Sequence, residues 1–587
     1  SEQEVAEKII YCDPLGNVVR LKDVAEITRQ YKDPSSIVNY NGHSAVILSV
    51  EKRLDNDIVA FGAKVDKVLD SFTGTLPESV TVSKITDQPK VVGNSVISFL
   101  RDLVISMLVV ILVMLMLFPI KSALIASSGV PVCTALALAV MFITGIDLNT
   151  VSLAALIVVL GMIVDDSIIT MDGYMGYLGK GMSQVDAAAA SAKELFMPMF
   201  MATFAICAMF FPIKGIITGY LGDFVTTFPW VVAIALSISL MYAMLVVPSL
   251  EVRYIKTART SGEGWFARIQ GKFFDAMQNG YEKLQAVCFR HPRLTLLMGA
   301  GAVCLGILMF TQLNIQMMPM AARDCFAVEI YLDGNAGLDQ TRAVSDSLQN
   351  ILLADRRVKS VTAFVGTSSP RFHATYAPQL PGRNYAQFIV NTTSVMATES
   401  ILKEYESRYE HYFPRALVRF KQMDYQAVSA PVEVIVKGSD QDALAPVAEK
   451  IKGYMYSLDD ILKWIHSDRD DYVSHVDIAL DPDEAARLGV NKAMLSMSLA
   501  GAFSGQTIAT LWEGDKKLPV NLYSMAVGPG MGYDVISDHI VPTNMPGVSV
   551  PLRQVADIHP DWSPETYARK AGEESVTIGA DMKYGCS

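Results

Sequence analysis

The sequence predicts a polytopic α-helical membrane protein that also carries α+β domains, and two observations support this prediction. Residues 103–313 are almost entirely apolar apart from one basic loop, whereas the segments before and after them have the composition of ordinary globular proteins. The whole chain is 51% apolar, with a mean hydropathy of +0.30. This division is typical of a membrane block between two water-soluble blocks.

Six segments are long and apolar enough to cross a bilayer, for which a helix needs about 20 residues. They span residues 103–118, 123–143, 148–171, 195–213, 224–250 and 294–311. Because hydrocarbon offers the backbone no hydrogen-bond partner, each segment is expected to be a helix.

The loop between the fifth and sixth segments is basic, and it sets the expected orientation. It contains Arg253, Lys256, Arg259, Arg268, Lys272, Lys283, Arg290 and Arg293. Cytoplasmic loops carry an excess of Lys and Arg, so we expect this loop in the cytoplasm and both soluble flanks on the other side of the membrane. Apolar residues recur about every four positions from Trp265 to Leu284. They predict an amphipathic helix that either lies along the inner membrane surface or packs on the bundle.

The soluble flanks alternate strands with helices. In the first flank we expect strands within residues 36–51 and 79–85, around a helix at 58–69. The second flank has three strand–helix–strand rounds, at 326–332, 338–352 and 358–364, then 385–391, 397–409 and 418–422, then 432–436, 443–456 and 473–480. This alternation predicts small α+β sandwiches with helices on one face of each sheet.

One sequence motif occurs twice. Residues 16–27 read GNVVRLKDVAEI, and residues 547–558 read GVSVPLRQVADI. A turn pair and a strand follow each copy, with Asn41-Gly42 in the first and Ala571-Gly572 in the second. Duplicated halves are common in transporters. We therefore expect a second membrane block beyond residue 587, which makes this chain a fragment that lacks both ends.

Two adjacent carboxyl groups lie inside the third apolar segment, which reads GMIVDDSIIT around Asp165 and Asp166. A charged side chain in the middle of a membrane costs several kcal/mol, so such residues face the bundle interior and are usually functional. No other apolar segment offers a Lys or Arg for a structural ion pair. We interpret the two carboxyls as one coupled proton-binding site whose occupancy can follow a proton gradient.

Several other classes of function are disfavoured. The chain has no G-x-x-x-x-G-K-[ST] motif for ATP, no H-E-x-x-H, no nucleophile elbow and no redox motif, so we expect a transporter rather than an enzyme. Its seven cysteines show neither C-x-x-C nor zinc spacing, and we expect no cofactor and no bound metal. A net charge of −11 argues against nucleic acid as a partner. Ion-coupled transport remains.

The third segment also carries a family resemblance. Residues 146–174, IDLNTVSLAALIVVLGMIVDDSIITMDGY, resemble the signature span of the resistance–nodulation–division efflux pumps, with Asn149, Gly161, Asp165 and Asp166 in matching positions. Residues 481–505 and the two copies of the repeated motif resemble the porter and docking regions of that family. The likeness covers essentially the whole chain. It is closest to the hydrophobe/amphiphile exporter branch, and it implies that the two aspartates form the proton relay.

The sequence departs from the family pattern at two points. Where the family usually has Glu-Asn and a further Glu, this chain has Asp172, Gly173 and Met175. The relay of the family also uses a Lys, with Arg and Thr nearby, from a second membrane half that this sequence does not contain. The chain as written is therefore not expected to pump.

The resemblance implies a set of partners and a location. It implies a proton antiporter, the inner-membrane subunit of a tripartite pump in a Gram-negative bacterium, that exports drugs, detergents or other amphiphilic small molecules. It also implies a homotrimer in membrane lipid, with a periplasmic adaptor protein and an outer-membrane channel. Phe364, Phe372 and Tyr376 fall where the family has its aromatic pocket and switch loop. Those three residues equally suit ordinary packing on a sheet.

The resemblance and the repeat together predict the domain organisation. Residues 1–97 would be an incomplete periplasmic porter and docking portion, 98–250 five transmembrane helices, 251–293 a cytoplasmic loop with the amphipathic helix, 294–313 the sixth transmembrane helix, 318–425 a ferredoxin-like porter subdomain, 426–505 a second porter subdomain, and 506–587 a docking portion with the start of the next porter subdomain.

Two other functions fit parts of the sequence. Met317, Met318 and Met320 offer soft ligands for a copper-like ion, which would suit a heavy-metal exporter of the same family. A non-pumping, sterol-sensor-like membrane protein would share the apolar segments but would not need paired carboxylates. The adjacent aspartates favour proton-driven export over both alternatives.

Overall fold

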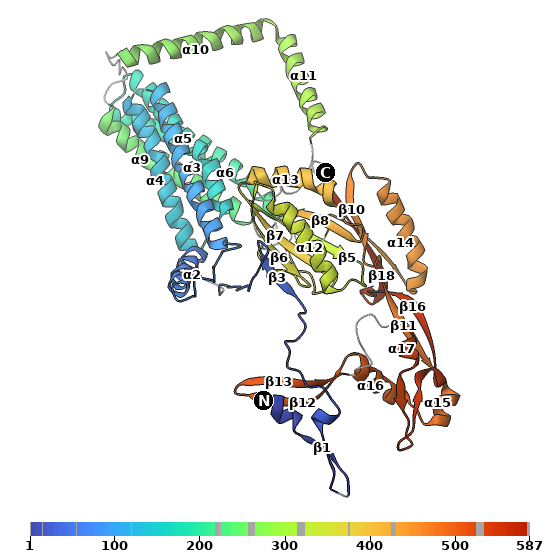
Figure 1. Cartoon of the computed structure of the whole chain (residues 1–587). Helices are drawn as coiled ribbons and strands as arrows, with labels where there is room; N and C mark the ends of the chain where they lie inside the picture. The colour runs from blue at the N-terminus through green and yellow to red at the C-terminus, as the bar shows by residue number, and fades with distance from the viewer. Residues whose placement is uncertain are drawn as a thin grey trace. The chain divides into compact units, whose positions relative to one another are not determined.

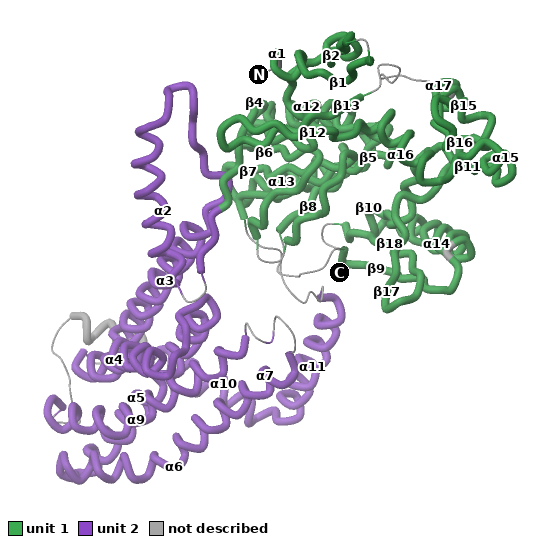
Figure 2. Tube along the Cα trace, turned by 90° about the horizontal axis from the view of Figure 1, so that it is seen from below, with its two compact units in different colours: residues 1–49, 314–587 green, residues 50–313 purple. Residues whose placement is uncertain are grey.

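The computed structural model describes residues 2–583 except 15, 54–55, 119, 218–221, 223–224, 256–264, 314–322, 374–375, 424–429 and 524–532. The chain forms two compact units (Figure 2). Unit 1 combines residues 1–49 with residues 314–587, and unit 2 comprises residues 50–313. Each unit is described by itself below.

Unit 2 is helical. Its helices are α2 (Ile58–Thr73), α3 (Gln88–Leu117), α4 (Ile120–Thr144), α5 (Thr150–Gly179), α6 (Gln184–Phe210), α7 (Pro212–Ile216), α9 (Thr227–Tyr254), α10 (Trp265–Arg290) and α11 (Pro292–Phe310). Among the described residues, six helices are long and apolar enough to cross a membrane, and they coincide with the six predicted segments. The prediction that each apolar segment forms a helix is therefore confirmed.

The centre of unit 2 is a bundle in which α5 and α9 pack against each other and against α4 and α6 (Figure 1). Helix α5 has a well-defined start because the Asn149 side chain accepts a hydrogen bond from the Ser152 backbone N–H at 2.8 Å. Pro131, Pro198 and Pro248 lie within α4, α6 and α9, as is tolerated in helices that neighbouring helices support.

Helix α10 matches the predicted amphipathic helix. Its apolar residues Met277, Tyr281 and Leu284 are 50%, 64% and 63% exposed. The described residues thus leave this apolar face largely uncovered.

Unit 1 is built around a six-stranded antiparallel sheet with the order β4-β3-β6-β7-β5-β8. Its strands are β3 (Ile37–Tyr40), β4 (His43–Ser44), β5 (Cys325–Leu332), β6 (Val358–Val365), β7 (Tyr385–Thr392) and β8 (Ala416–Gln422). Helices α12 (Leu338–Leu353) and α13 (Val395–Tyr409) pack on this sheet, and their apolar residues share one core with alternate strand residues.

A second sheet contains β9 (Val432–Gly438), β10 (Leu462–Ser467), β17 (Ala568–Lys570) and β18 (Glu573–Met582), with α14 (Gln441–Tyr456) against it. A third cluster joins β11 (Tyr472–Leu480), β16 (Ala556–Pro564), β14 (Ile540–Pro542) and β15 (Ser549–Pro551) to the helices α15 (Pro482–Leu488), α16 (Lys492–Phe503) and α17 (Tyr533–Ser537). The remaining elements are the hairpin of β12 (Gln506–Glu513) with β13 (Lys516–Leu522), and α1 (Glu2–Ala6) with the pair β1 (Ile9–Cys12) and β2 (Val18–Arg20).

One strand prediction was wrong, and another predicted strand forms but belongs to a different sheet. Residues 79–85 alternate in polarity but form no strand, because they have no neighbouring strand to pair with among the described residues. Residues 473–480 form the predicted strand, β11, but it pairs with β16, and β10 takes the expected place beside α14 in the second sheet. The alternating pattern of β10 is broken where the register shifts between Lys463 and His466, and Trp464 there has φ +47°.

The internal repeat is visible in the backbone. In both copies a glycine with positive φ, Gly16 at +88° and Gly547 at +77°, precedes a short strand. A single 3₁₀ turn follows each strand, at Leu21–Asp23 after β2 and at Leu552–Gln554 after β15.

The turn pairs that follow the two copies are equally alike. Asn41-Gly42 joins β3 to β4 with φ values of +49° and +83°. Ala571-Gly572 joins β17 to β18 with φ values of +57° and +86°. Both are two-residue hairpin loops of type I′, which require positive φ at both central positions. The duplication extends from the motif into the hairpin beyond it.

Candidate functional site

Asp165 and Asp166 lie in the middle of α5, and they point in different directions because neighbouring helix residues are about 100° apart. Asp165 is exposed on the surface of the bundle, whereas Asp166 is partly buried and faces α9. The structure therefore separates the environments of the two predicted site residues.

Ser239 of α9 is the partner of Asp166. Its hydroxyl lies 2.8 Å from Asp166 Oδ2 and 3.2 Å from the carbonyl oxygen of Ile163, and the serine itself is buried. A hydroxyl has one proton to donate and can also accept. Ser239 can thus donate to an ionised Asp166, or it can accept from a protonated Asp166 while it donates to the Ile163 carbonyl.

Polar groups continue along the same face of α5 at intervals of four residues. Thr170 donates to the Asp166 carbonyl oxygen at 2.9 Å, and Ser191 of α6 donates to the Thr170 carbonyl oxygen at 3.1 Å. One turn further, the buried Tyr174 hydroxyl donates to the Ile255 carbonyl oxygen at 2.8 Å. The face of α5 that carries Asp166 is therefore lined with hydroxyl groups.

Gly173 allows α5 and α6 to approach closely beside this row. A Cβ atom at this position would lie 2.5 Å from Ser191 Oγ and 2.7 Å from a methyl carbon of Leu195. The glycine that departs from the family pattern thus has a packing role.

Neither aspartate forms an ion pair within the part of the chain that the structure describes. The ion pairs of the described part of unit 2 lie elsewhere, between Lys84 and the carboxylates of Asp66 and Asp87, and between Arg101 and Asp102. The carboxyls are therefore not fixed by a structural Lys or Arg from the described helices.

The three predicted cargo-site aromatics gather on the face of the six-stranded sheet opposite α12 and α13. Phe364 is paired in register with Gln387, and Gln387 with Glu329, so the three share that face. Tyr376 donates from its hydroxyl to Glu329 and accepts from the Gln387 amide at 2.8 Å. The rings of Phe372 and Tyr376 lie 5.2 Å apart. Phe364 and Tyr376 are buried.

This sheet face also holds a buried charge cluster that the sequence did not indicate. Arg419 donates two hydrogen bonds to Asp581, at 2.6 and 2.7 Å, and one to Glu329 at 3.2 Å. Its guanidinium lies 3.9 Å from the centre of the Trp464 ring. The available signal was a charged residue flanked by apolar ones within a strand, Glu329 in CFAVEIYL and Arg419 in ALVRFKQ.

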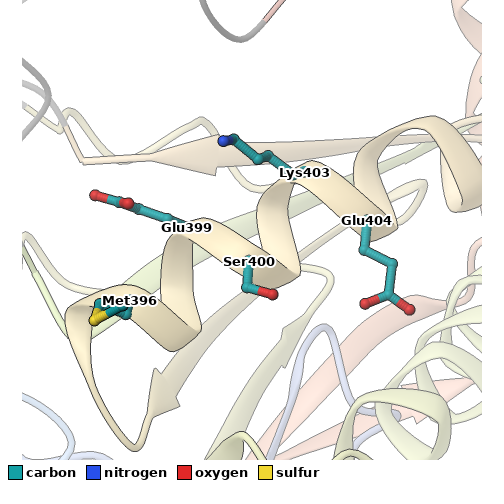
Figure 3. Close-up of a pocket in the computed structure, with 5 residues that line it drawn as sticks. All are labelled: Met396, Glu399, Ser400, Lys403 and Glu404. Atoms are coloured by element: carbon teal, nitrogen blue, oxygen red, sulfur yellow. The ribbon is translucent and has the colours of Figure 1, made fainter.

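A shallow hollow of about 450 Å³ runs along the exposed face of α13, lined by Met396, Glu399, Ser400, Lys403 and Glu404 (Figure 3). All five residues come from one helix, and none was a predicted site residue. Among the described residues, no group of three or more His, Cys, Asp or Glu side chains is placed to hold a metal ion. Met317, Met318 and Met320 lie outside the described residues.

The family model described as "AcrB/AcrD/AcrF family" matches residues 1–587. The chain belongs to this family. The members of this family are resistance–nodulation–division permeases, so the resemblance noted in the sequence is confirmed.

Individual relatives agree with this assignment. The chain is 24% identical over 583 residues to "Multidrug resistance protein MdtC" of Klebsiella pneumoniae (strain 342), a match that covers 97% of this chain and 55% of the relative. It is also 24% identical over 579 residues to the MdtC protein of Escherichia coli O7:K1 (strain IAI39 / ExPEC), with the same coverage. The chain spans about half the length of the curated relatives it matches.

Proposed function

We propose that this chain is part of a secondary transporter that exports hydrophobic or amphiphilic compounds, such as drugs and detergents, in exchange for protons. The observation that carries the proposal is the position of Asp165 and Asp166 halfway along a membrane-spanning helix, with Asp166 against the Ser239 hydroxyl of α9. Two relatives bear the name "Multidrug resistance protein MdtC", which supports drugs as the cargo class.

The proposed coupling uses the proton on the carboxyl pair. With Asp166 ionised, Ser239 donates to its carboxylate, and the charge favours contact with a cation or water. Protonation neutralises the group and lets Ser239 donate to the Ile163 carbonyl instead. The two states favour different packing of α5 against its neighbours, and alternating between them would drive the transport cycle.

The sheet domains would form the cargo path. The order β8-β5-β7-β6, with α12 and α13 connecting β5 to β6 and β7 to β8, supports a ferredoxin-like porter subdomain. Phe364, Phe372 and Tyr376 are the proposed cargo contacts on the sheet face opposite the helices, since aromatic rings suit apolar ligands. Phe364 and Tyr376 are buried in this state, so cargo would reach them only after the neighbouring loop moves.

The proposed assembly follows the family. It is a homotrimer in the inner membrane of a Gram-negative bacterium, with the soluble domains in the periplasm. The copies of the repeated motif, at β2 and β15, would contribute to a docking portion that meets a periplasmic adaptor protein and, through it, an outer-membrane channel.

The test measures export of an amphiphilic fluorescent dye by cells that express the full reading frame encoding this chain. We expect Asp165→Asn and Asp166→Asn to reduce proton-dependent export to the level of cells without the protein, because neither amide can carry the proton. Asp172→Asn is the matched control, since Asp172 is exposed on the same helix. Unchanged export in both Asp165→Asn and Asp166→Asn would overturn the proposal. A resistance to metal salts that chelators abolish would favour the heavy-metal alternative.

A further inference from the structure

A third carboxyl lies inside the bundle, near the end of α9 that leads into the basic loop. Glu251 is fully buried, with 0% of its surface exposed. Neither of its carboxyl oxygens has a hydrogen-bond partner among the described residues. The predicted fifth segment ended at residue 250, one position before it, whereas α9 continues to Tyr254.

An ionised carboxylate in such a place is strongly unfavourable. Removing a charge from water without a cation or donor costs far more than the packing of one side chain returns, so an isolated buried acid is neutral instead. A Leu or Met would fill the same volume at no such cost. The position of Glu251 therefore indicates a group that holds a proton.

Glu251 belongs to the same helix face as the partner of Asp166. Ser239, Ala243, Val247 and Glu251 follow one another at intervals of four residues on α9, and all four are buried. The twelve residues from Ser239 to Glu251 correspond to a rise of ~18 Å along the helix. One seam of the bundle thus has a carboxyl at each end, Asp166 against Ser239 at one and Glu251 at the other.

The opposing helix completes this seam. On α5 the residues Asp166, Thr170 and Tyr174 also follow at intervals of four, and α5 is packed against α9. Tyr174 interacts electrostatically with Glu251, and its hydroxyl donates a hydrogen bond to the Ile255 carbonyl at the end of α9. Hydroxyl groups therefore lie along the path between the two carboxyls.

Among the described residues, the other charged groups at this end of the bundle are exposed. They are Lys121 of α4, Asp172 and Lys180 at the end of α5, Asp186, Lys193 and Glu194 of α6, and Arg253 of α9. Tyr174 of α5 is the buried titratable group whose interaction with Glu251 the structure records. Glu251 is therefore enclosed by uncharged packing from the described parts of α4, α5 and α6.

We propose that Glu251 is a second proton-holding site, which exchanges protons with the cytoplasm at one end of the α5–α9 seam and receives them from Asp166 at the other. In each cycle its carboxyl releases a proton to cytoplasmic water, and the resulting carboxylate is reprotonated along the seam. This inference rests on the proposed function, because Asp166 is the donor in that transfer.

The test combines a spectroscopic measurement with an export measurement. The full chain is reconstituted in lipid vesicles, and infrared difference spectra record protonated carboxyl groups at neutral pH. We expect one protonated-carboxyl band to vanish in Glu251→Gln and to persist in Asp166→Asn. The matched control is Glu194→Gln, because Glu194 is an exposed carboxyl at the same end of the bundle. In cells, Glu251→Gln is expected to reduce proton-dependent dye export, and Glu251→Asp to restore part of it.

The outcomes separate the two hypotheses. If Asp166→Asn abolishes export while Glu251→Gln changes neither the band nor export, the Glu251 site is wrong and the proposed function stands. If Asp166→Asn exports normally, the proposed function fails whatever the spectrum of Glu251. If the wild-type spectrum contains a Glu251 carboxylate band instead, a cation holds this residue ionised, and the second proton site is overturned. An immunoblot measures the amount of each variant in the membrane. Equal amounts show that a loss of export does not come from misfolding.

Discussion

At the scale of single residues, Ser239 is the side chain on which the protonation state of Asp166 depends. It reaches both Asp166 Oδ2 and the Ile163 carbonyl, and one proton cannot serve both at once. A hydrogen bond to a charged group contributes about 1.5–3 kcal/mol. We therefore expect Ser239→Ala to slow proton-dependent export by roughly tenfold or more, since 1.4 kcal/mol corresponds to a factor of about ten.

Two further variants make this prediction specific. Ser239→Thr keeps the hydroxyl and should retain most of the export rate. Ser249→Ala, on the same helix but exposed and bonded only to the Leu245 carbonyl in the structure as described, should have no effect. Dye export is measured across a range of pH. Equal export rates in Ser239→Ala and Ser249→Ala would contradict the role of Ser239.

Sequence patterns revealed the aspartates but not their surroundings. Asp165 and Asp166 are conspicuous because charge is costly in an apolar segment. Ser239 is not, because serine is common in membrane helices and its partner lies 73 residues away. Glu251 was missed because hydropathy places a helix end only approximately, and the predicted segment stopped one residue short of it.

At the scale of elements, Arg357 fastens α13 to the turn between α12 and β6. Its guanidinium donates to Asp355 and lies 2.7 Å from a carboxyl oxygen of Glu404. The hydrogen bond from Arg357 holds the pKa of Asp355 at about 2, below its usual 3.8. A lowered pKa means that the bound carboxylate stabilises the fold above pH ~3.8 and that this contribution is lost as the pH falls to ~2.

We therefore expect Arg357→Met to destabilise the α13 region by about 2 kcal/mol at pH 7, and by much less near pH 2. Hydrogen exchange of the α13 amides in the full chain measures this directly. Arg356→Met is the control, because Arg356 directly precedes Arg357 in the sequence and is exposed. A loss of protection that is the same at both pH values would show that Arg357 acts by packing rather than through its charge.

Element prediction succeeded where hydrophobic periodicity is regular. The strands and helices from β5 to β8 begin and end within a few residues of the predicted ranges. The pattern failed at β10, where a bulge and the left-handed Trp464 interrupt alternation. It also failed at residues 79–85, because alternation describes one strand alone and cannot reveal whether a partner strand exists.

At the scale of the whole molecule, Arg419 joins the two larger sheets of unit 1. It lies in β8 of the six-stranded sheet and binds Asp581 in β18 of the second sheet through two hydrogen bonds. Glu329 in β5 adds a second carboxylate, and the side chains of Arg419 and Glu329 are only 2% and 1% exposed. Arg419 is thus the cation that both carboxylates share at the buried contact between the sheets.

Removing this cation should be costly. We expect Arg419→Met to destabilise the joined sheets by about 3–5 kcal/mol, because it removes the cation that two buried carboxylates share. Arg419→Lys should recover only part of this, since lysine cannot form the paired contact with Asp581. The combination Arg419→Met, Asp581→Asn and Glu329→Gln should be milder than Arg419→Met alone. Thermal unfolding and limited proteolysis of the full chain rank the stabilities of these variants. A triple variant less stable than Arg419→Met would contradict the prediction.

The large-scale organisation was only partly predictable. The sequence marks a membrane block between two flanks, and the repeat is evident in the letters. No sequence pattern indicates that β3, from the first flank, pairs with β6 from the second flank. The whole helical unit separates these two strands in the sequence. Such long-range pairing depends on the surfaces that the folded segments present to each other, and one sequence read alone does not record it.

The two type I′ turns share one backbone geometry although their first residues differ. Asn41 and Ala571 differ in chemistry, yet both adopt left-handed backbone angles before a glycine. Asparagine tolerates this conformation, whereas alanine adopts it at a cost. The hairpin formed by β17 and β18 thus holds Ala571 in a backbone conformation that its own side chain disfavours. Backbone dihedral angles should therefore align the two copies of this motif more closely than their amino acids do.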